Sequence, residues 1–339
     1  MRSVKTWLWI GLLMTLIQVL LGGITRLTGS GLSITEWEVL VGTLPPINEQ
    51  QWNDAFDKYK QFPQFNLINQ DMTLAGFKEI YFWEYWHRNW ARLLGFVFII
   101  PFIWFLVKRK LNRSWIIKLL LLLFLGGLQG FMGWVMVASG LIDKPWVSPY
   151  NLTIHLLLAL TVFVYILWLI FQLREYQPQD DHPTVNKGIK WIIGLIALQI
   201  IYGGFMAGTK AGLTYTTYPL MNGKFFPDGF FLFHSFISNI FENHTAINFI
   251  HRTLAVIVVL IITIFSIKNL NYAGTTVRSG ILMLLSLIFI QFALGIYTLL
   301  SGRTGEISIT LGVLHQITAF FVMGACTFIL YFSKNRSRT

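Results

Sequence analysis

Long apolar segments separated by short polar ones form the main pattern of this chain. A bilayer core about 30 Å thick is spanned by roughly 20 apolar residues in a helix, and eight segments reach or approach that length. Because a membrane core satisfies backbone polar groups only in helices or closed barrels, we predict eight transmembrane helices. They are Trp7–Thr25, Trp86–Val107, Trp115–Val137, Leu152–Leu173, Trp191–Ala207, Ile247–Ile267, Gly280–Leu300 and Ile309–Phe332.

The segment between the first two predicted helices, 26–85, is longer than a plain connector. Trp52, Phe56 and Tyr59 recur in it at helical spacing, which predicts an amphipathic helix. We expect this segment to lie on the outer membrane surface. A solvated loop with scattered aromatic residues is the alternative.

The chain also repeats itself. Gln18–Gly23 matches the segment 199–204, and the two pairs of corresponding histidines, His87 with His251 and His155 with His315, lie at slightly shorter offsets. Four helices per copy is an even number, so both copies cross the membrane in the same direction and the repeat is parallel. The predicted fold is therefore all-α, with one four-helix bundle in residues 1–180 and a second in 181–339.

Composition and charge support a membrane protein and argue against a nucleic-acid partner. Hydrophobic residues make up 55% of the 339 positions and charged residues 12%, far from soluble usage. The net charge of +11 comes from basic residues scattered between apolar segments, whereas nucleic acid requires them on one surface. Fifteen of the 26 basic residues lie on the side of both termini, which predicts cytoplasmic termini in a bacterial inner membrane.

Four histidines carry the candidate chemistry: His87, His155, His251 and His315. Ionisable residues are costly inside a membrane and are functional by default. These four lie at similar depth in the even-numbered helices, two per half, and facing imidazoles in a bundle fit six-coordinate heme iron. A zinc or copper site would also recruit carboxylates or thiolates, and the only cysteine, Cys326, lies in the last apolar segment. Taken singly, each histidine has the alternative of bonding a neighbouring carbonyl.

Arginines accompany the histidines. Arg88 and Arg252 directly follow His87 and His251, and Arg92 lies one turn further along. A guanidinium pairs with a carboxylate through two parallel hydrogen bonds, so the three arginines are candidate contacts for heme propionates. The alternative is basic side chains that reach toward the membrane interface.

One acid breaks the repeat. Glu84 lies three residues before His87 on the same helical face, whereas Asn248 holds the matching position before His251. Only one histidine pair has a carboxylate beside it. This difference predicts that one half of the chain carries out chemistry and the other serves binding or electron transfer. Glu84 is thus the candidate base, and the alternative is that it orients a histidine by hydrogen bonding.

Several motifs together resemble the heme A synthase family in its proteobacterial and mitochondrial form, over nearly the whole chain. The first is Gly-Gly-Ile-Thr-Arg-Leu-Thr-Gly-Ser-Gly-Leu-Ser at 22–33, and the second is Glu-Tyr-Trp-His-Arg at 84–88. The others are Glu36-Trp37, Gly42 with Pro45-Pro46, Phe77-Lys78, His155, Tyr202-Gly-Gly204, Ala211-Gly212-Leu213, His251-Arg252 and His315-Gln316.

The resemblance implies oxidation of a ring methyl group of heme O, through an alcohol, to the formyl group of heme A, with water as the oxygen source. It places the substrate heme on His87 and His155 beside Glu84, and a bound heme b on His251 and His315. Some members have a cysteine pair in the first outer loop. This chain has none there, which excludes a thiol step in that loop.

The resemblance also implies a place in the assembly of aa3-type cytochrome c oxidase. Heme O synthase and oxidase assembly factors are then candidate partners besides membrane lipid, while the electron acceptor and the oligomeric state, a homo-oligomer included, stay open. Two other functions use the same histidine pairs: a diheme b-type cytochrome linked to quinone, and a heme carrier without enzymatic activity. The pigments bound by the purified protein separate the three.

Overall fold

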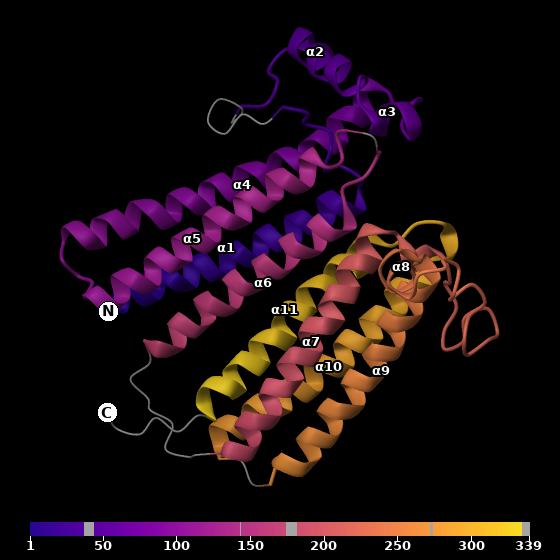
Figure 1. Ribbon diagram of the computed structural model, residues 1–339. Coiled ribbons are helices and arrows are strands. Elements are labelled where there is room, and N and C mark those ends of the chain that lie inside the picture. The colour runs from indigo at the N-terminus through magenta and orange to yellow at the C-terminus, as the bar shows by residue number, and fades with distance from the viewer. Residues whose placement is uncertain (37–43, 143, 174–181, 272–273, 334–339) are drawn as a thin grey trace. The chain divides into compact units, whose positions relative to one another are not determined.

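The computed structural model describes residues 1–36, 44–142, 144–173, 182–271 and 274–333. These residues form helices and no strand (Figure 1), which confirms the all-α fold. Among them, eight helices are long and apolar enough to cross a membrane, so the chain is a multi-pass membrane protein. The eight are α1 (Arg2–Leu27), α4 (Leu74–Val107), α5 (Arg113–Ala138), α6 (Pro149–Gln172), α7 (Pro183–Gly208), α9 (His244–Asn269), α10 (Thr275–Ser301) and α11 (Ile309–Phe332).

Helix α4 begins much earlier than the apolar pattern predicts. It starts at Leu74, where the side chain of Thr73 accepts a hydrogen bond from the backbone N–H of Gly76 at 3.3 Å. Its 34 residues reach about 51 Å at 1.5 Å per residue, well beyond a bilayer core of about 30 Å. The polar first turns of α4 therefore extend past the apolar layer.

The projecting turns of α4 support the two short helices α2 (Glu49–Tyr59) and α3 (Pro63–Leu67). The predicted amphipathic helix is confirmed as α2. Its Phe56 and Tyr59 are buried against Phe77 of α4, with the rings of Phe56 and Phe77 stacked at 5.0 Å. These aromatic side chains therefore pack on α4, and the position of α2 on the outer membrane surface stays a prediction.

The chain forms two compact units that divide within α6. Unit 1 is Ser3–Val162 and unit 2 is Phe163–Thr339. The predicted boundary between residues 180 and 181 lies outside the described residues. Short helices complete the fold: η1 (Ala211–Leu213) and α8 (Phe236–Glu242) between α7 and α9, and η2 (Gly302–Thr304) after α10.

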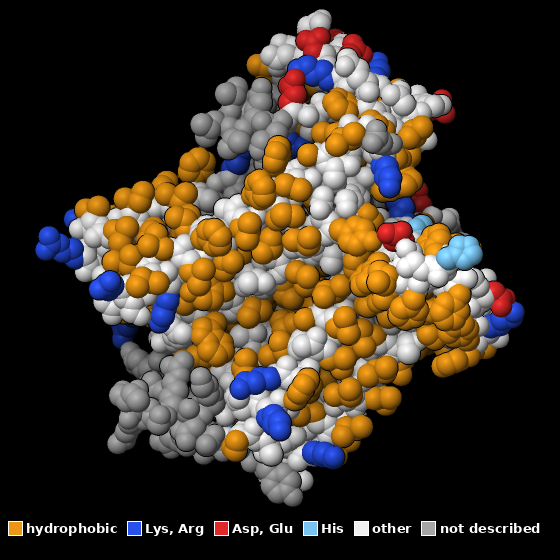
Figure 2. Space-filling view, in the orientation of Figure 1, with side chains coloured by type: hydrophobic (Ala, Val, Ile, Leu, Met, Phe, Trp, Pro, Cys, Tyr) orange, Lys and Arg blue, Asp and Glu red, His pale blue; other side chains and the backbone are white. Residues whose placement is uncertain are grey.

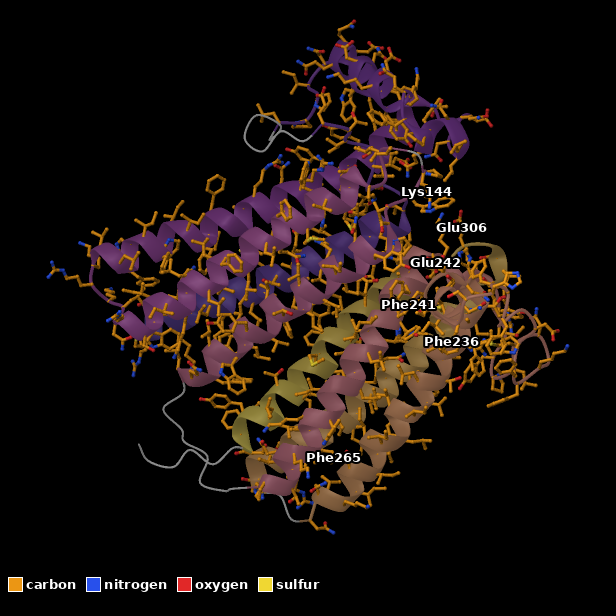
Figure 3. The ribbon with its side chains drawn as sticks, viewed as in Figure 1. Lys144, Phe236, Phe241, Glu242, Phe265 and Glu306 are labelled. Atoms are coloured by element: carbon orange, nitrogen blue, oxygen red, sulfur yellow. The ribbon has the colours of Figure 1, made fainter. Side chains whose placement is uncertain are left out.

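In unit 2 four membrane helices close a bundle. Helix α7 packs against α9 and α11, and α10 packs against the same two helices. Phe241 and Glu242 of α8 lie toward one end of this bundle and Phe265 toward the other (Figure 3). The last turns of α6 join the unit through Phe163, whose ring lies 5.5 Å from that of Phe320 in α11.

In unit 1 helix α5 packs against α4, and side chains attach α1 to α4. The indole N–H of Trp7 donates to the carbonyl of Val97 at 2.8 Å, and that of Trp90 donates to Met14 at 2.9 Å. Hydrophobic side chains cover the visible flanks of the long helices (Figure 2), as lipid contact requires. A parallel repeat of two bundles stays a prediction.

Candidate functional site

The four membrane histidines take similar positions on their helices. His155, His251 and His315 lie in the second turn of α6, α9 and α11, and His87 lies in α4 just after its projecting turns. All four are partly buried. His87 and His155 are close enough to interact electrostatically within unit 1, as are His251 and His315 within unit 2.

In unit 1 each histidine contacts a glutamine of the preceding membrane helix. The Nε2 amide of Gln18 in α1 lies 3.2 Å from Nδ1 of His87 and donates to the backbone carbonyl of that histidine at 3.2 Å. The Nε2 amide of Gln129 in α5 lies 3.2 Å from Nε2 of His155. Nδ1 of His155 is buried and has no hydrogen-bond partner among the described residues.

Unit 2 repeats this arrangement. The Nε2 amide of Gln199 in α7 lies 3.2 Å from Nδ1 of His251 and donates to its backbone carbonyl at 3.1 Å. The Nε2 amide of Gln291 in α10 lies 3.5 Å from Nε2 of His315. Nδ1 of His315 faces the backbone carbonyl of Gln291 at 3.2 Å, so its other nitrogen, Nε2, is left as the one with a lone pair.

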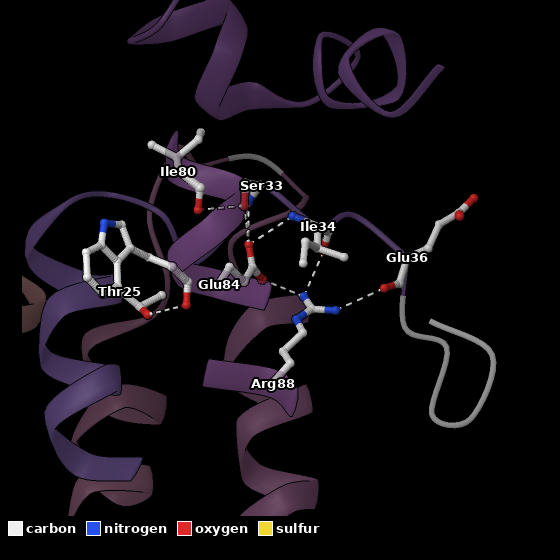
Figure 4. A network of polar contacts seen from close by, with 8 residues as sticks. Thr25, Ser33, Ile34, Glu36, Ile80, Glu84 and Arg88 are labelled. Atoms are coloured by element: carbon white, nitrogen blue, oxygen red, sulfur yellow. Dashed lines mark hydrogen bonds and ion pairs between the residues drawn. The ribbon is translucent and has the colours of Figure 1, made fainter. Parts of the chain in front are cut away.

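Glu84 is at the centre of a polar network that ties α4 to the loop after α1 (Figure 4). Its Oε2 accepts from the N–H and hydroxyl of Ser33, both at 2.7 Å, and from the N–H of Ile34 at 2.9 Å. Its Oε1 pairs with Nη2 of Arg88 at 2.6 Å. Among the described residues His87 is not a partner of this buried carboxylate, although the two lie on one helix.

The other predicted arginine contacts lie beside this network. Arg88 also donates to the carbonyls of Ile34 at 2.7 Å and Glu36 at 3.0 Å. Arg92 donates to the side chain of Asn89 at 3.0 Å. Both arginines line a pocket of about 350 Å³ together with tyrosines of α4. This volume lies within the range of about 300–1,000 Å³ that ligand pockets have, and the two guanidinium groups suit an anionic group.

In unit 2 the corresponding arginine is Arg252, which makes fewer hydrogen bonds to the described residues than Arg88 does. Nη2 of Arg252 donates to the carbonyl of Pro219 at 2.9 Å, and the guanidinium lies 5.4 Å from the ring centre of Tyr218. Its Nη1 is buried without a hydrogen-bond partner among the described residues. A buried cationic donor without a partner fits an anionic group such as a propionate.

A sequence profile decides the family. The profile of the cytochrome oxidase assembly protein family matches residues 5–327. The chain belongs to this family. It is 42% identical over 336 residues to the heme A synthase of Flavobacterium johnsoniae, covering 97% of each chain. It is 39% identical over 340 residues to the heme A synthase of Wolbachia pipientis wMel, covering 99% of this chain and 94% of the other. The resemblance read from the motifs is thereby confirmed.

The residues of this cytochrome oxidase assembly protein fit a heme better than a bare metal ion. Among the described residues no group of three or more His, Cys, Asp and Glu side chains could hold a metal ion, whereas heme iron needs only two axial ligands from the protein. The single thiol, Cys326, is fully buried in α11 and apart from the histidines in sequence. Two histidines per unit therefore match the donor set of a heme.

Four functional candidates in this family member were not singled out from the sequence: Gln18, Gln129, Gln199 and Gln291. Each contacts a membrane histidine, and each has a buried Oε1 without a partner among the described residues. The signal was present, because each glutamine stands four residues before a glycine on the helix that precedes a histidine helix. A residue and its fourth successor share one helix face, so the motif could have predicted a common contact.

Proposed function

We propose that this chain is a heme A synthase, which oxidises a ring methyl group of heme O through an alcohol to the formyl group of heme A. The observation that carries the proposal is the histidine pair in each unit, in a chain similar over nearly its full length to proteins named heme A synthase. One pair serves the substrate and the other a resident heme.

The reaction balances with water as the oxygen source. In the first step the methyl carbon loses a C–H bond and gains a C–O bond from water, releasing two protons and two electrons. In the second step the alcohol loses two more protons and two more electrons to become the aldehyde. Four electrons therefore leave to an acceptor outside this chain, and four protons must leave the site.

The substrate site belongs to unit 1. We place heme O on His87 and His155, with the pocket beside Arg88 and Arg92 taking its propionates. Arg88 and Arg92 directly follow the projecting first turns of α4, so a porphyrin bound beside them would have its charged edge toward the membrane interface.

We place heme b on His251 and His315 in unit 2, with Arg252 as the propionate contact. When bound there, heme b supplies one-electron transfer. No acid faces this pair at the position that Glu84 holds in unit 1, since Asn248 stands there.

A catalytic role for Glu84 stays a prediction. A base needs a lone pair that can take a proton in reach of the substrate. In the arrangement described, both carboxylate oxygens accept hydrogen bonds, from Ser33, Ile34 and Arg88. Oε1 accepts from Arg88 alone among the described residues, and a carboxylate oxygen can accept two hydrogen bonds. The second lone pair of Oε1 is therefore the one that would take a proton.

Extracted porphyrins test the proposed function. Mass analysis of the purified protein should find heme B together with heme O or heme A. Heme B alone would favour a diheme quinone-linked cytochrome. A heme that never changes under turnover conditions would favour a carrier.

We further propose that both termini face the cytoplasm and that α2 lies outside a bacterial inner membrane, from the distribution of basic residues. Reporter fusions after residue 333 should be active in the cytoplasm, and those within the loop around Tyr59 outside it. A cytoplasmic signal at Tyr59 would overturn the orientation.

A further inference from the structure

Each histidine of unit 1 lies with one ring edge against a glycine of the preceding helix. A Cβ built on Gly22 would lie 3.0 Å from Cε1 of His87, and one built on Gly133 would lie 3.0 Å from Cε1 of His155. Carbon atoms in ordinary contact are about 3.5–4.0 Å apart. An alanine at either place would therefore push the imidazole away.

Unit 2 has the same two contacts between histidine and glycine, but one is closer than the other. A Cβ on Gly295 would lie 2.9 Å from Cε1 of His315, whereas one on Gly203 would lie 3.4 Å from Cε1 of His251. The first requires a shift of the ring and the second nearly none. The chain thus offers two substitutions of identical chemistry and different expected effect.

The glutamine one turn before each glycine contacts the same ring. When iron takes the lone pair of one imidazole nitrogen, the other nitrogen carries a proton and needs an acceptor. The carbonyl oxygens of Gln18, Gln129, Gln199 and Gln291 are buried acceptors without partners among the described residues. Rotation of the amide by half a turn exchanges its donor and acceptor atoms. The same side chain can therefore bond a ring nitrogen that carries a proton or one that has a lone pair.

Because this motif occurs once before each histidine helix, we infer that the four Gln-x-x-x-Gly pairs are positioning residues for the ligand histidines. The glycine sets where the ring lies. The glutamine bonds the ring nitrogen that does not face the iron, through its side-chain amide or, for His315, through the backbone carbonyl of Gln291. The inference rests on the proposed function, since it assumes that the histidines bind heme. It assigns to Gln18/Gly22, Gln129/Gly133, Gln199/Gly203 and Gln291/Gly295 a role that is separate from ligation.

Glycine substitutions in unit 2 test the steric half of the inference on the purified full-length protein with its hemes. Gly295→Ala should convert the low-spin heme signal or lower heme retention at least tenfold. Gly203→Ala should change the same spectrum much less. Gly194→Ala in α7, where a Cβ meets no atom within 4 Å, is the matched control and should leave the spectrum unchanged. Equal spectra for Gly295→Ala and Gly194→Ala would overturn the steric role.

Glutamine substitutions test the hydrogen-bonding half. Loss of such a partner typically weakens metal affinity about 10–100-fold, and we expect this for heme retention by Gln199→Leu. A stronger acceptor makes the imidazole a better donor to ferric iron, so Gln199→Glu should lower the reduction potential and Gln199→Leu should raise it. A merely structural glutamine would not move the potential in opposite directions. Unchanged potential and retention in both variants would overturn the role.

The two proposals fail differently. If the low-spin spectrum survives both His251→Ala and His315→Ala, the heme assignment itself is wrong. If those variants abolish the spectrum while the Gly295 and Gln199 variants match the wild type, only the positioning role is wrong. Should Gln199→Leu not fold, Gln199→Glu keeps the size and polarity of the side chain and still reports the potential.

Discussion

In each unit a side chain holds the loop that follows the first membrane helix, α1 or α7, against the next one, α4 or α9. The side chain accepts hydrogen bonds in unit 1 and donates them in unit 2. In unit 1 the carboxylate of Glu84 accepts from the backbone N–H groups of Ser33 and Ile34. In unit 2 the amide of Asn248, at the matching position, donates to the backbone carbonyl of Ala211 at 2.8 Å. One loop presents donors to a charge and the other presents an acceptor to a neutral amide. The same helical position therefore closes both loops, but only unit 1 keeps an ionisable group there.

The arginines four residues later complete the difference. Arg88 lies against the carboxylate of Glu84, and both side chains are at most 10% exposed. Among the described residues Arg252 has no carboxylate partner and one of its nitrogens is buried and unpaired; it contacts Pro219 and Tyr218 instead. The guanidinium of Arg88 is thus held by its own loop and its own helix. That of Arg252 has a donor available to an anionic ligand.

The largest effects should come from the histidines, which separate the two units. His251→Ala should abolish the low-spin heme b signal, because one axial ligand is lost. His87→Ala should leave that signal in place and stop heme A formation. Absorption spectra together with porphyrin extraction measure both. Loss of the low-spin signal in His87→Ala and not in His251→Ala would reverse the assignment of the two units.

Glu84→Ala should have the next largest effect, because it leaves the buried guanidinium of Arg88 without its counter-ion. Breaking such a pair costs about 3–5 kcal/mol, which thermal unfolding in detergent can detect. Glu84→Gln is the sharper variant, since it keeps the size of the side chain and cannot act as a base. It should retain both hemes and accumulate heme O or the alcohol if Glu84 takes a proton. Normal heme A output would end the catalytic role, and loss of the substrate heme would leave only the loop-holding role.

A carboxylate introduced at the matching position of unit 2 tests whether the two units differ there. Asn248→Asp places a carboxylate against the carbonyl of Ala211 at a fully buried position. Two acceptors facing each other leave a buried charge unsatisfied, which costs at least several kcal/mol. Unit 2 should therefore lose heme b in Asn248→Asp. A stable, heme-loaded variant would show that the loop can rearrange and that the two positions are interchangeable.

A smaller effect is expected from the arginine with the unpaired nitrogen. A hydrogen bond to a charged group contributes about 1.5–3 kcal/mol, so Arg252→Leu should weaken heme b retention about 10–100-fold without unfolding the chain. Arg88→Leu should instead lower the stability of unit 1, since it leaves Glu84 buried without a cation. Heme retention and thermal unfolding distinguish the two outcomes. Arg303→Leu, which removes an exposed arginine of unit 2, is the control.

The sequence predicted all eight membrane helices among the described residues, because apolar length alone indicates them. The repeat singled out the four histidines, whose role as ligands stays a prediction. The sequence did not predict the partners of Glu84, since Ser33 and Ile34 reach it through a turn at Gly29, whose positive φ of 67° no periodic pattern specifies. It also placed the start of α4 too late. The first turns contain Lys78 and Glu79, so a search for apolar length reads them as loop.

The smallest effect should come from Tyr59, which belongs to unit 1 alone. Its hydroxyl accepts from the Asn69 amide at 2.8 Å and donates to Gln64 at 3.0 Å, and Gln64 in turn donates to the carbonyl of Gly29 at 2.8 Å. Tyr59→Phe leaves the Gln64 oxygen without its donor, so we expect a loss of about 1 kcal/mol. Limited proteolysis of the loop measures it, with the heme b spectrum of unit 2 unchanged.

The stabilisation that Tyr59 contributes to the loop should decrease at alkaline pH. Burial raises the pKa of the Tyr59 phenol above its ordinary value of 10.0. The folded loop therefore holds this proton more tightly than the unfolded loop does, and its stability falls as pH rises. The contribution of Tyr59 should be fully present below pH 10.0 and be lost as pH rises through the raised pKa. The difference in protease resistance between wild type and Tyr59→Phe should stay constant at neutral pH and narrow in strong alkali. A difference that grows with pH would show that the phenol ionises more readily in the folded loop, and Tyr59 would then not be a buried neutral donor.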